Sequence, residues 1–291
     1  MDTVGIVGAG QMGSGIAEVV AVAGVRAIVH EPEAGPLHAS EERIAASLAK
    51  AVDRGKLDAQ DAAQAAERIV YTTRLDDLTE CQLVVEAVTE DRAIKCEVFR
   101  TLDERLPRDV ILASNTSSIP ITTLAQATSR PDRVLGLHFF SPVPVMALVE
   151  IVPGYATCHG AIEATEAFAR QLGKHAIRSK DRAGFVVNLL LIPYLVGAIH
   201  LYDAGYATRE NIDEAMTLGC GHPMGPLALC DFIGLDVIDG ICACLYEEYG
   251  RDEFAAPPLL RRMVAAGALG RKAGHGFYEY APARPPALAS R

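Results

Sequence analysis

The sequence predicts an α/β fold in which a doubly wound, mostly parallel sheet precedes an all-helical domain. Three observations support this prediction. A glycine-rich turn follows the first apolar run, close to the amino terminus. Short apolar runs then alternate with helical patterns, as in parallel strands joined by crossover helices. After residue 183 only long helical patterns remain, so we expect a separate helical domain there.

The amino-terminal turn carries glycines at a spacing that suits an anionic ligand. Residues 4–7 form an apolar run, and Gly8, Gly10 and Gly13 follow it in a Gly-x-Gly-x-x-Gly pattern. The first glycine allows a tight bend, the second lets a pyrophosphate approach the backbone, and the third packs the helix against the strand. The pattern predicts a Rossmann-type dinucleotide site. The alternative is a glycine-rich turn without a ligand.

A carboxylate downstream supports the dinucleotide interpretation. The apolar run 27–30 ends at Glu31, where such sites place an acidic residue for the ribose hydroxyls. Gln11 and Met12 lie inside the glycine turn, where the helix begins and its amides face the phosphate. We therefore expect both to contact the same ligand.

Two helices, rather than one crossover helix, are expected after Glu31. Ser40 is predicted to cap the first helix, which ends near Gly55, and Asp58 is predicted to cap the second, over 59–69. This pattern predicts a helical hairpin inserted in the nucleotide-binding fold. An arm near the cofactor crevice could reach a long substrate.

The remaining elements follow from apolar periodicity. Strands are expected at 83–85, 110–113, 134–137, 148–152 and 176–178. Helices are expected at 94–106, 121–128, 161–172, 185–204, 209–217, 226–249 and 259–266. These patterns predict a first domain over 1–182 and a second over 183–291.

Composition excludes several function classes. The net charge of -10 argues against nucleic acid as a partner. No basic segment precedes the first apolar run, and the uncharged stretch 184–201 is interrupted by Asn188 and Pro193, so neither a signal peptide nor a membrane span is expected. The cysteines are odd in number and scattered, which predicts reduced thiols, a cytoplasmic location and no metal site.

One histidine and one glutamate are placed for acid–base chemistry. His138 closely follows the predicted strand 134–137, and Glu150 lies in the next apolar run after a proline-rich turn. A strand, turn and returning strand would bring the two side chains together. A carboxylate bound to one imidazole nitrogen fixes the tautomer and leaves the other nitrogen to accept a proton.

Several longer motifs follow the glycine turn in a fixed order. They are SNTSS at 114–118, HFFSPVPVMALVE at 138–150, KDRAGFVVN at 180–188, GHPMGPLALCDFIGLD at 221–236 and GRKAGHGFY at 270–278. With these motifs the chain resembles the L-3-hydroxyacyl-CoA dehydrogenases, in particular the 3-hydroxybutyryl-CoA type. The resemblance implies an NAD-binding domain, a helical domain that forms a homodimer, and an acyl-CoA substrate.

The resemblance also assigns roles to individual residues. It implies that His138 and Glu150 are the catalytic pair and that Ser117 and Asn188 contact the substrate oxygen. The NAD contacts that it implies, beyond the glycine turn, are Glu31, Glu90, Lys95, Ser117, Ser141 and Lys272. The CoA contacts that it implies are Ser47 and Arg54, to which we add the neighbouring Lys56 because an acidic chain needs a local basic site for CoA phosphates.

The implied reaction moves a proton and a hydride. His138 takes the proton of the substrate 3-hydroxyl while the hydride at C3 passes to NAD, giving a 3-ketoacyl-CoA. The sequence departs from the family pattern at three positions. Ser141 stands where many members have asparagine, and Ala183 and Leu189 stand where proline and arginine are usual.

Other functions stay open at this point. A dehydrogenase of a sugar acid, similar to L-gulonate dehydrogenase, would share the fold and the His–Glu pair. A non-catalytic NAD-binding relative would share the fold alone. A β-hydroxyacid dehydrogenase with a catalytic lysine is disfavoured, because Lys180 lacks the glycine pattern of that family.

Overall fold

The computed structural model describes residues 1–280 and divides the chain into two compact units, of which the second begins at Val186. The predicted second domain extends to residue 291, and its last eleven residues lie outside the described range. Among the described residues, no helix has both the length and the apolar character that crossing a membrane requires.

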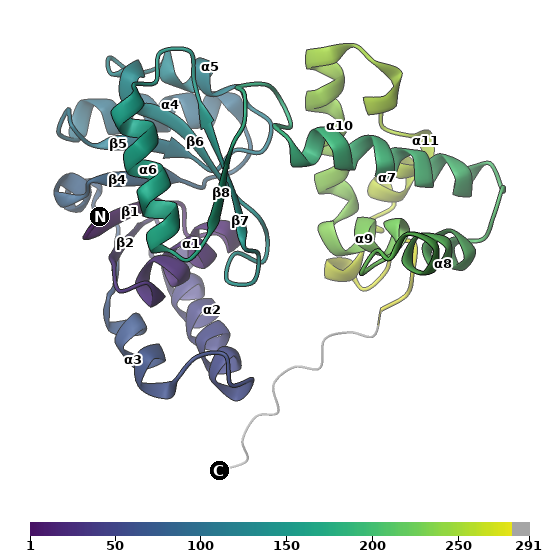
Figure 1. The fold of residues 1–291 in the computed structure, drawn as a ribbon, viewed down its shortest axis with the longest axis horizontal. Helices are drawn as coiled ribbons and strands as arrows, with labels where there is room; N and C mark the ends of the chain where they lie inside the picture. The colour runs from purple at the N-terminus through teal and green to yellow at the C-terminus, as the bar shows by residue number, and fades with distance from the viewer. Residues whose placement is uncertain (281–291) are drawn as a thin grey trace. The chain divides into compact units, whose positions relative to one another are not determined.

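The first unit is an eight-stranded sheet with helices on both faces (Figure 1). Its strands are β1 (Thr3–Val7), β2 (Arg26–His30), β3 (Ile69–Thr72), β4 (Leu83–Glu86), β5 (Ile111–Ser114), β6 (Val134–Phe139), β7 (Leu148–Pro153) and β8 (His175–Arg178). Its helices are α1 (Gln11–Val22), α2 (Ala34–Asp53), α3 (Ala59–Glu67), α4 (Arg92–Arg105), α5 (Ile121–Ala125) and α6 (His159–Gln171), with short 3-10 helices η1 (Leu75–Glu80) and η2 (Pro131–Arg133).

The strand order is β3-β2-β1-β4-β5-β6-β7-β8. All neighbouring pairs are parallel except β6 and β7, which are antiparallel. This confirms the predicted doubly wound, mostly parallel sheet. Strands are added on one side from β1 to β3 and on the other side from β4 onward, so the strand order reverses between β1 and β4. Ligands bind at the carboxyl ends of the strands at such a point.

Two apolar cores cover the faces of the sheet. One core joins the sheet to α1, α2, α3 and α6, with Ile16, Leu48 and Phe168 buried in it. The other joins the opposite face to η1, α4 and α5, around Leu78 and Phe99. The central strands are buried on both faces, which is why they read as nearly continuous apolar runs.

The glycine turn has the geometry that its sequence predicts. Gly8 has φ +107°, and a Cβ there would lie 2.7 Å from the carbonyl oxygen of Ala87. A Cβ on Gly13 would lie 1.9 Å from the carbonyl oxygen of Gly8, so α1 packs directly against the turn. Larger residues at either position would displace the turn.

The predicted helical hairpin is present as α2 and α3, which project beyond the sheet (Figure 1). Its predicted start was wrong: α2 begins at Ala34, and Ser40 lies inside the helix rather than at its cap. Ser40 is fully buried and shares a hydrogen bond with Ser14 of α1 at 2.8 Å between their Oγ atoms. A small polar residue at this position serves helix packing, which local capping rules do not detect.

The second helix of the hairpin begins as predicted, because Asp58 accepts a hydrogen bond from the amide of Gln60 at 2.8 Å. It ends earlier than predicted, at Glu67. Residues 69–72 form strand β3 at the edge of the sheet, which the sequence pattern missed. The two middle residues of this short segment are half-buried and its ends are buried, so it lacks the alternation that marks a strand, and the helix predicted over 59–69 overlaps its first residue.

The second unit is helical, as predicted. It contains α7 (Val187–Asp203), α8 (Arg209–Cys220), α9 (Pro226–Ile233), α10 (Leu235–Tyr249) and α11 (Pro258–Ala265), with 3-10 helices η3 (Asp252–Phe254) and η4 (Arg271–Ala273). The predicted single helix over 226–249 is two helices, because the chain breaks at Gly234 with φ +107°. Asp213 caps α9 through the amides of Leu227 and Ala228.

Candidate active site

The structure brings His138 and Glu150 together on neighbouring strands. The antiparallel register of β6 and β7 pairs these two residues directly. Nδ1 of His138 lies 2.7 Å from Oε2 of Glu150, and the side chains are 7% and 0% exposed. The buried carboxylate fixes the orientation of the ring, so Nε2 is the atom that can exchange a proton with a ligand.

Aromatic rings surround the imidazole. The ring of Phe140 lies 4.5 Å from that of His138, and the ring of Phe185 lies 5.6 Å away, measured between centroids. Asn115 holds the adjacent backbone, because its Oδ1 accepts a hydrogen bond from the amide of Phe139 at 2.9 Å. These contacts restrict the ring to one position and keep its surroundings apolar.

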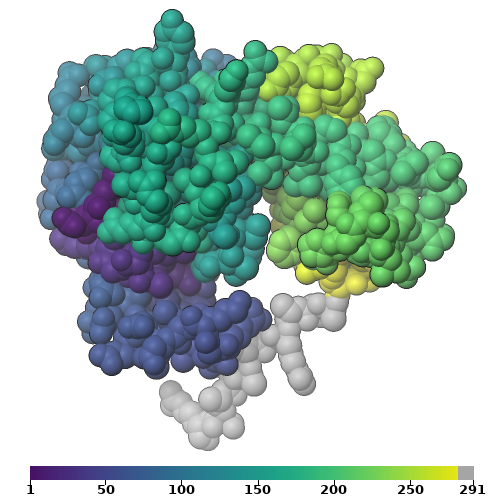
Figure 2. Space-filling view, in the orientation of Figure 1, coloured from purple at the N-terminus to yellow at the C-terminus, as the bar shows by residue number. Residues whose placement is uncertain are grey.

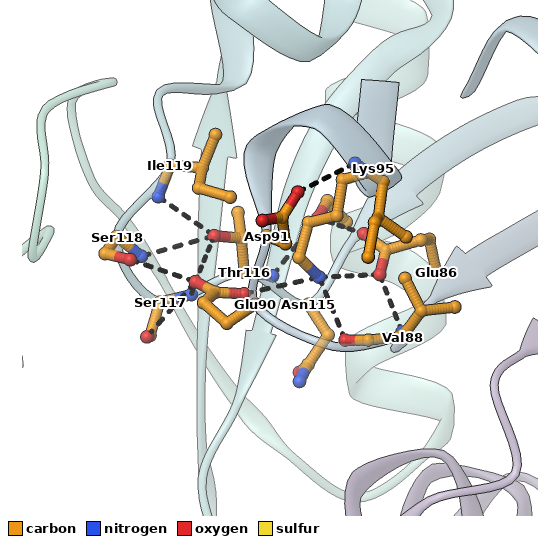
Figure 3. Close-up of polar contacts among 12 residues, drawn as sticks. Glu86, Val88, Glu90, Asp91, Lys95, Asn115, Thr116, Ser117, Ser118 and Ile119 are labelled. Atoms are coloured by element: carbon orange, nitrogen blue, oxygen red, sulfur yellow. Dashed lines mark hydrogen bonds and ion pairs between the residues drawn. The ribbon is translucent and has the colours of Figure 1, made fainter. Parts of the chain in front are cut away.

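A buried ion-pair network lies where β4 and β5 end (Figure 3). Lys95 of α4 is 1% exposed, and its Nζ lies 2.6 Å from Oε1 of Glu86 and 3.3 Å from Oε2 of Glu90. Nζ also donates to the carbonyl of Val88 at 3.3 Å, while Ser114 donates to Oε2 of Glu86 at 2.6 Å. The buried ammonium is therefore neutralised and hydrogen-bonded, as a charge at this depth requires.

Glu90 connects this network to the SNTSS segment at 114–118 (Figure 3). Its Oε1 accepts hydrogen bonds from Thr116 Oγ1, the Ser117 amide and Ser118 Oγ at 2.6, 2.9 and 3.0 Å. Burial raises the pKa of Glu90, but Lys95 and these donors outweigh it and hold the pKa below its usual value. Glu90 is thus a carboxylate at neutral pH and fixes the backbone of Ser117.

A cavity of about 1060 Å³ lies in the first unit beside the glycine turn. It is lined by the turn, by Glu31, by residues 87–89 after β4 and by one face of α4, which carries both apolar and charged side chains. A Cβ on Gly10 would have no heavy atom within 4 Å, so the space above the turn is open to a phosphate. Glu31 accepts the amide of Ala9 at 3.0 Å through Oε2, which leaves Oε1 for ribose hydroxyls. These residues fit a dinucleotide.

His30 lines the same cavity and is 7% exposed. Burial lowers the pKa of His30, although Glu31 and Asp77 act in the opposite direction. The ring is therefore neutral at pH 7. A neutral imidazole does not offset the charge of Glu31, so the carboxylate still repels an extra phosphate on the ribose.

Among the predicted NAD and CoA contacts, Gln11 lies on α1, Ser47 lies on α2 and Ser141 lies in the loop after β6. Gln11 Nε2 donates to Ser141 Oγ at 3.2 Å, which joins two predicted cofactor residues. Ser47 donates to Oε1 of Glu18 at 2.9 Å, and burial raises the pKa of Glu18 despite this bond. A second cavity, of about 120 Å³, is lined by these four residues among others.

Met12 lies in the first turn of α1 and packs partly buried against the core. Arg54 is the carboxyl-terminal cap of α2, and Lys56 follows it; both are exposed. They lie about two helical turns beyond Ser47. The arm that carries them projects from the first unit in the space-filling view (Figure 2).

Two predicted site residues belong to the second unit. Asn188 is buried in the first turn of α7. Lys272 lies in η4, where its Nζ donates to Oδ2 of Asp236 at 2.6 Å. Their predicted contacts with substrate and NAD stay predictions.

Three further residues of these contacts were not predicted from the sequence: Glu86, Glu18 and Arg43. Glu86 ends strand β4 inside an apolar run, which is itself a signal, since a buried carboxylate requires a partner. Glu18 lies in the middle of an apolar helix and gives the same signal. Arg43 gave none, because it is one of several charged residues on an exposed helix.

Comparison with known families gives a match over nearly the whole chain. Residues 3–182 match the NAD-binding domain of 3-hydroxyacyl-CoA dehydrogenase, and residues 184–280 match the carboxyl-terminal domain of the same family.

Individual relatives agree with this match. A 3-hydroxybutyryl-CoA dehydrogenase of Mycobacterium tuberculosis is 52% identical over 279 residues, which are 95% of this chain and 98% of the relative. Human mitochondrial hydroxyacyl-coenzyme A dehydrogenase is 41% identical, over 94% of this chain and 90% of its own. The crystal structure of (S)-3-hydroxybutyryl-CoA dehydrogenase PaaH1 from Ralstonia eutropha superposes with a TM-score of 0.91 at 45% identity, covering 97% of this chain and 99% of that one.

The glycine turn, the buried His–Glu pair and the two matched domains lead to one identification. The chain belongs to the 3-hydroxyacyl-CoA dehydrogenase family and is an NAD-dependent oxidoreductase.

Proposed function

We propose that this enzyme oxidises L-3-hydroxybutyryl-CoA to acetoacetyl-CoA with NAD and catalyses the reverse reduction. The contact between His138 and Glu150 is the observation that carries the proposal. The relatives named as 3-hydroxybutyryl-CoA dehydrogenases support the short acyl chain. The sugar-acid alternative has no comparable support.

His138 acts as the general base. Its Nε2 accepts the proton of the substrate 3-hydroxyl, and the bound NAD supplies the hydride acceptor. Glu150 holds Nδ1–H and stabilises the imidazolium that forms. Ser117 and Asn188 donate to the oxygen whose charge changes during the reaction.

The NAD site is built from the first unit. Gly8, Gly10 and Gly13 shape the turn, and the amides of Gln11 and Met12 face the pyrophosphate. Glu31 binds the ribose hydroxyls. Glu90, Lys95 and Ser141 form the nicotinamide end, and Lys272 is a further NAD contact that the family resemblance implies.

The second unit is proposed to form a homodimer, and its Asn188 is the substrate contact that the family resemblance implies. Its exposed apolar side chains support dimerisation, including Leu190 and Leu218, which are 72% and 83% exposed. The cytoplasmic location stays a prediction from the sequence.

Acyl chain length is tested by steady-state reduction. We expect kcat/KM to be highest with acetoacetyl-CoA and to fall as the 3-ketoacyl chain is lengthened. A preference for long chains in the same assay would contradict the short-chain assignment while leaving the reaction class intact.

NAD is expected to be preferred over NADP, because Glu31 accepts the ribose hydroxyls and repels a 2′-phosphate while His30 is neutral. Replacing Glu31 by glutamine should reduce the ratio of kcat/KM values for NADH and NADPH by about tenfold or more, since one charge interaction is worth about 1.4 kcal/mol or more in a partly buried site. Equal efficiency with both cofactors in the wild-type protein would show that Glu31 does not face the ribose.

The exposed bases of the arm are expected to bind the CoA phosphates. Replacing Arg54 and Lys56 together by alanine should raise KM for acetoacetyl-CoA about three- to thirtyfold, as expected for exposed charge pairs of up to about 1 kcal/mol each. KM for NADH should change little. If KM for the thioester stays at the wild-type value, CoA binds elsewhere.

A further inference from the structure

Arg43 of α2 contacts the glycine turn directly. Its Nη1 donates to Ser14 Oγ and to the carbonyl oxygens of Ala9 and Gly10, at 3.2 and 3.4 Å for the carbonyls. An arginine of the arm thus lies on the turn that shapes the dinucleotide site. The turn follows β1 of the sheet, so this contact joins helix α2 of the arm to the sheet.

Arg43 differs from the other bases that line the large cavity. Arg74 lies 3.7 Å from Asp77, and Arg105 lies 3.5 Å from Asp76. Within residues 1–280, Arg43 has no carboxylate within 4.0 Å. The acids on the cavity wall are Glu31, Asp76 and Glu97. Arg43 therefore supplies an unpaired positive charge beside the turn in a chain of net charge -10.

The guanidinium has donors to spare. Arginine carries five N–H groups in a planar fork, and the contacts above use those of Nη1 alone. The remaining groups on Nε and Nη2 suit a phosphate, which arginine binds with two parallel hydrogen bonds. Arg43 also lines the small cavity that contains Ser47, so it lies between the two cavities.

We propose that Arg43 binds a pyrophosphate oxygen of the dinucleotide and so fixes α2 against the glycine turn when the dinucleotide is bound. This rests on the proposed function, in which NAD is the ligand of the turn. A consequence is that binding of the dinucleotide orders α2, the helix of the arm that leads to the proposed CoA contacts.

The test is NADH binding to the full-length protein, followed by fluorescence titration. Replacing Arg43 by glutamine keeps an amide donor for the turn carbonyls but removes the charge. We expect its Kd for NADH to rise about ten- to hundredfold, the value of a charge-assisted hydrogen bond of about 1.5–3 kcal/mol. Arg43→Lys should recover part of this loss. The Kd for ADP-ribose, which keeps the pyrophosphate, should rise by the same factor in Arg43→Gln.

Lys50→Gln is the matched control, because Lys50 is exposed two turns further along α2 and lines neither cavity. Its Kd should stay at the wild-type value.

Raising the salt from about 50 to about 500 mM should weaken NADH binding by the wild-type protein more than by Arg43→Gln. Salt screens the attraction between the Arg43 charge and the phosphate, and the variant lacks that charge. A purely structural role would leave this salt dependence unchanged.

Hydrogen exchange tests the second half of the proposal. NADH should slow exchange in residues 34–53 of wild type and not in Arg43→Gln. If Arg43→Gln binds NADH with wild-type affinity, the inference is overturned while the proposed function stands. The same holds if Arg43→Gln weakens the binding of CoA but not that of NADH. A wild-type protein that binds no NADH would instead overturn the proposed function.

If Arg43→Gln does not fold by circular dichroism, Arg43→Lys and the salt dependence of wild type decide the question. Wild-type NADH affinity in Arg43→Lys, together with salt-independent binding by the wild-type protein, would then overturn the inference.

Discussion

Replacing His138 by glutamine is expected to lower turnover with acetoacetyl-CoA by about two to four orders of magnitude, the usual contribution of a positioned acid or base. Glutamine cannot transfer the proton, although it fills a similar volume. NADH binding should be nearly unchanged, because the cofactor cavity is lined by other residues. Stopped-flow or steady-state kinetics and a fluorescence titration measure the two quantities separately.

Glu150→Gln should act in the same direction, because Glu150 holds Nδ1 of His138 at 2.7 Å. The two residues form one unit, so the double variant should lose little more than His138→Gln alone. His159→Gln is the matched control, since His159 is 71% exposed on α6 and should leave turnover unchanged. If both site variants fold and keep near-normal turnover, the proton passes through another group.

Replacing Lys95 by methionine is expected to destabilise the protein by about 3–5 kcal/mol, because it leaves a buried carboxylate without its counter-charge. Glu86 is 0% exposed and lies 2.6 Å from Lys95 Nζ. Urea unfolding monitored by circular dichroism measures the change. The double variant Lys95→Met with Glu86→Gln should recover much of the loss, because the fully buried Glu86 side chain then carries no charge.

Arg100→Met on the same helix provides the control, because Arg100 is 51% exposed in its pair with Glu97. Such exposed pairs contribute about 1 kcal/mol or less. An unchanged free energy of unfolding in Lys95→Met would show that the contact between Lys95 and Glu86 does not stabilise the fold. The network in Figure 3 would then have no structural role.

The sheet and the catalytic pair could be predicted because each has a local signal. Apolar runs bounded by turns mark the central strands, and a strand, turn and returning strand place His138 opposite Glu150. Edge strand β3 was missed because it is short and half-buried, so its pattern resembles the end of the preceding helix.

Residues that act through distant partners could not be predicted. Ser40 resembles a helix cap in sequence but is buried against Ser14 of α1. The family resemblance predicted that Lys95 contacts the cofactor. It did not predict the ion pair with Glu86, which forms because α4 packs against the end of β4. Arg43 reaches the glycine turn across thirty-three positions of sequence. Such contacts follow from helix packing, which local patterns do not specify.

The most direct test of the central claim is NADH formation by the purified protein with NAD and L-3-hydroxybutyryl-CoA. The D-enantiomer and L-gulonate are measured in parallel. We predict steady NADH formation with the L-thioester, and little with the other two, because only the L-thioester offers both the CoA moiety and the correct face of C3 to His138. Oxidation of L-gulonate with no reaction of the thioester would contradict the account.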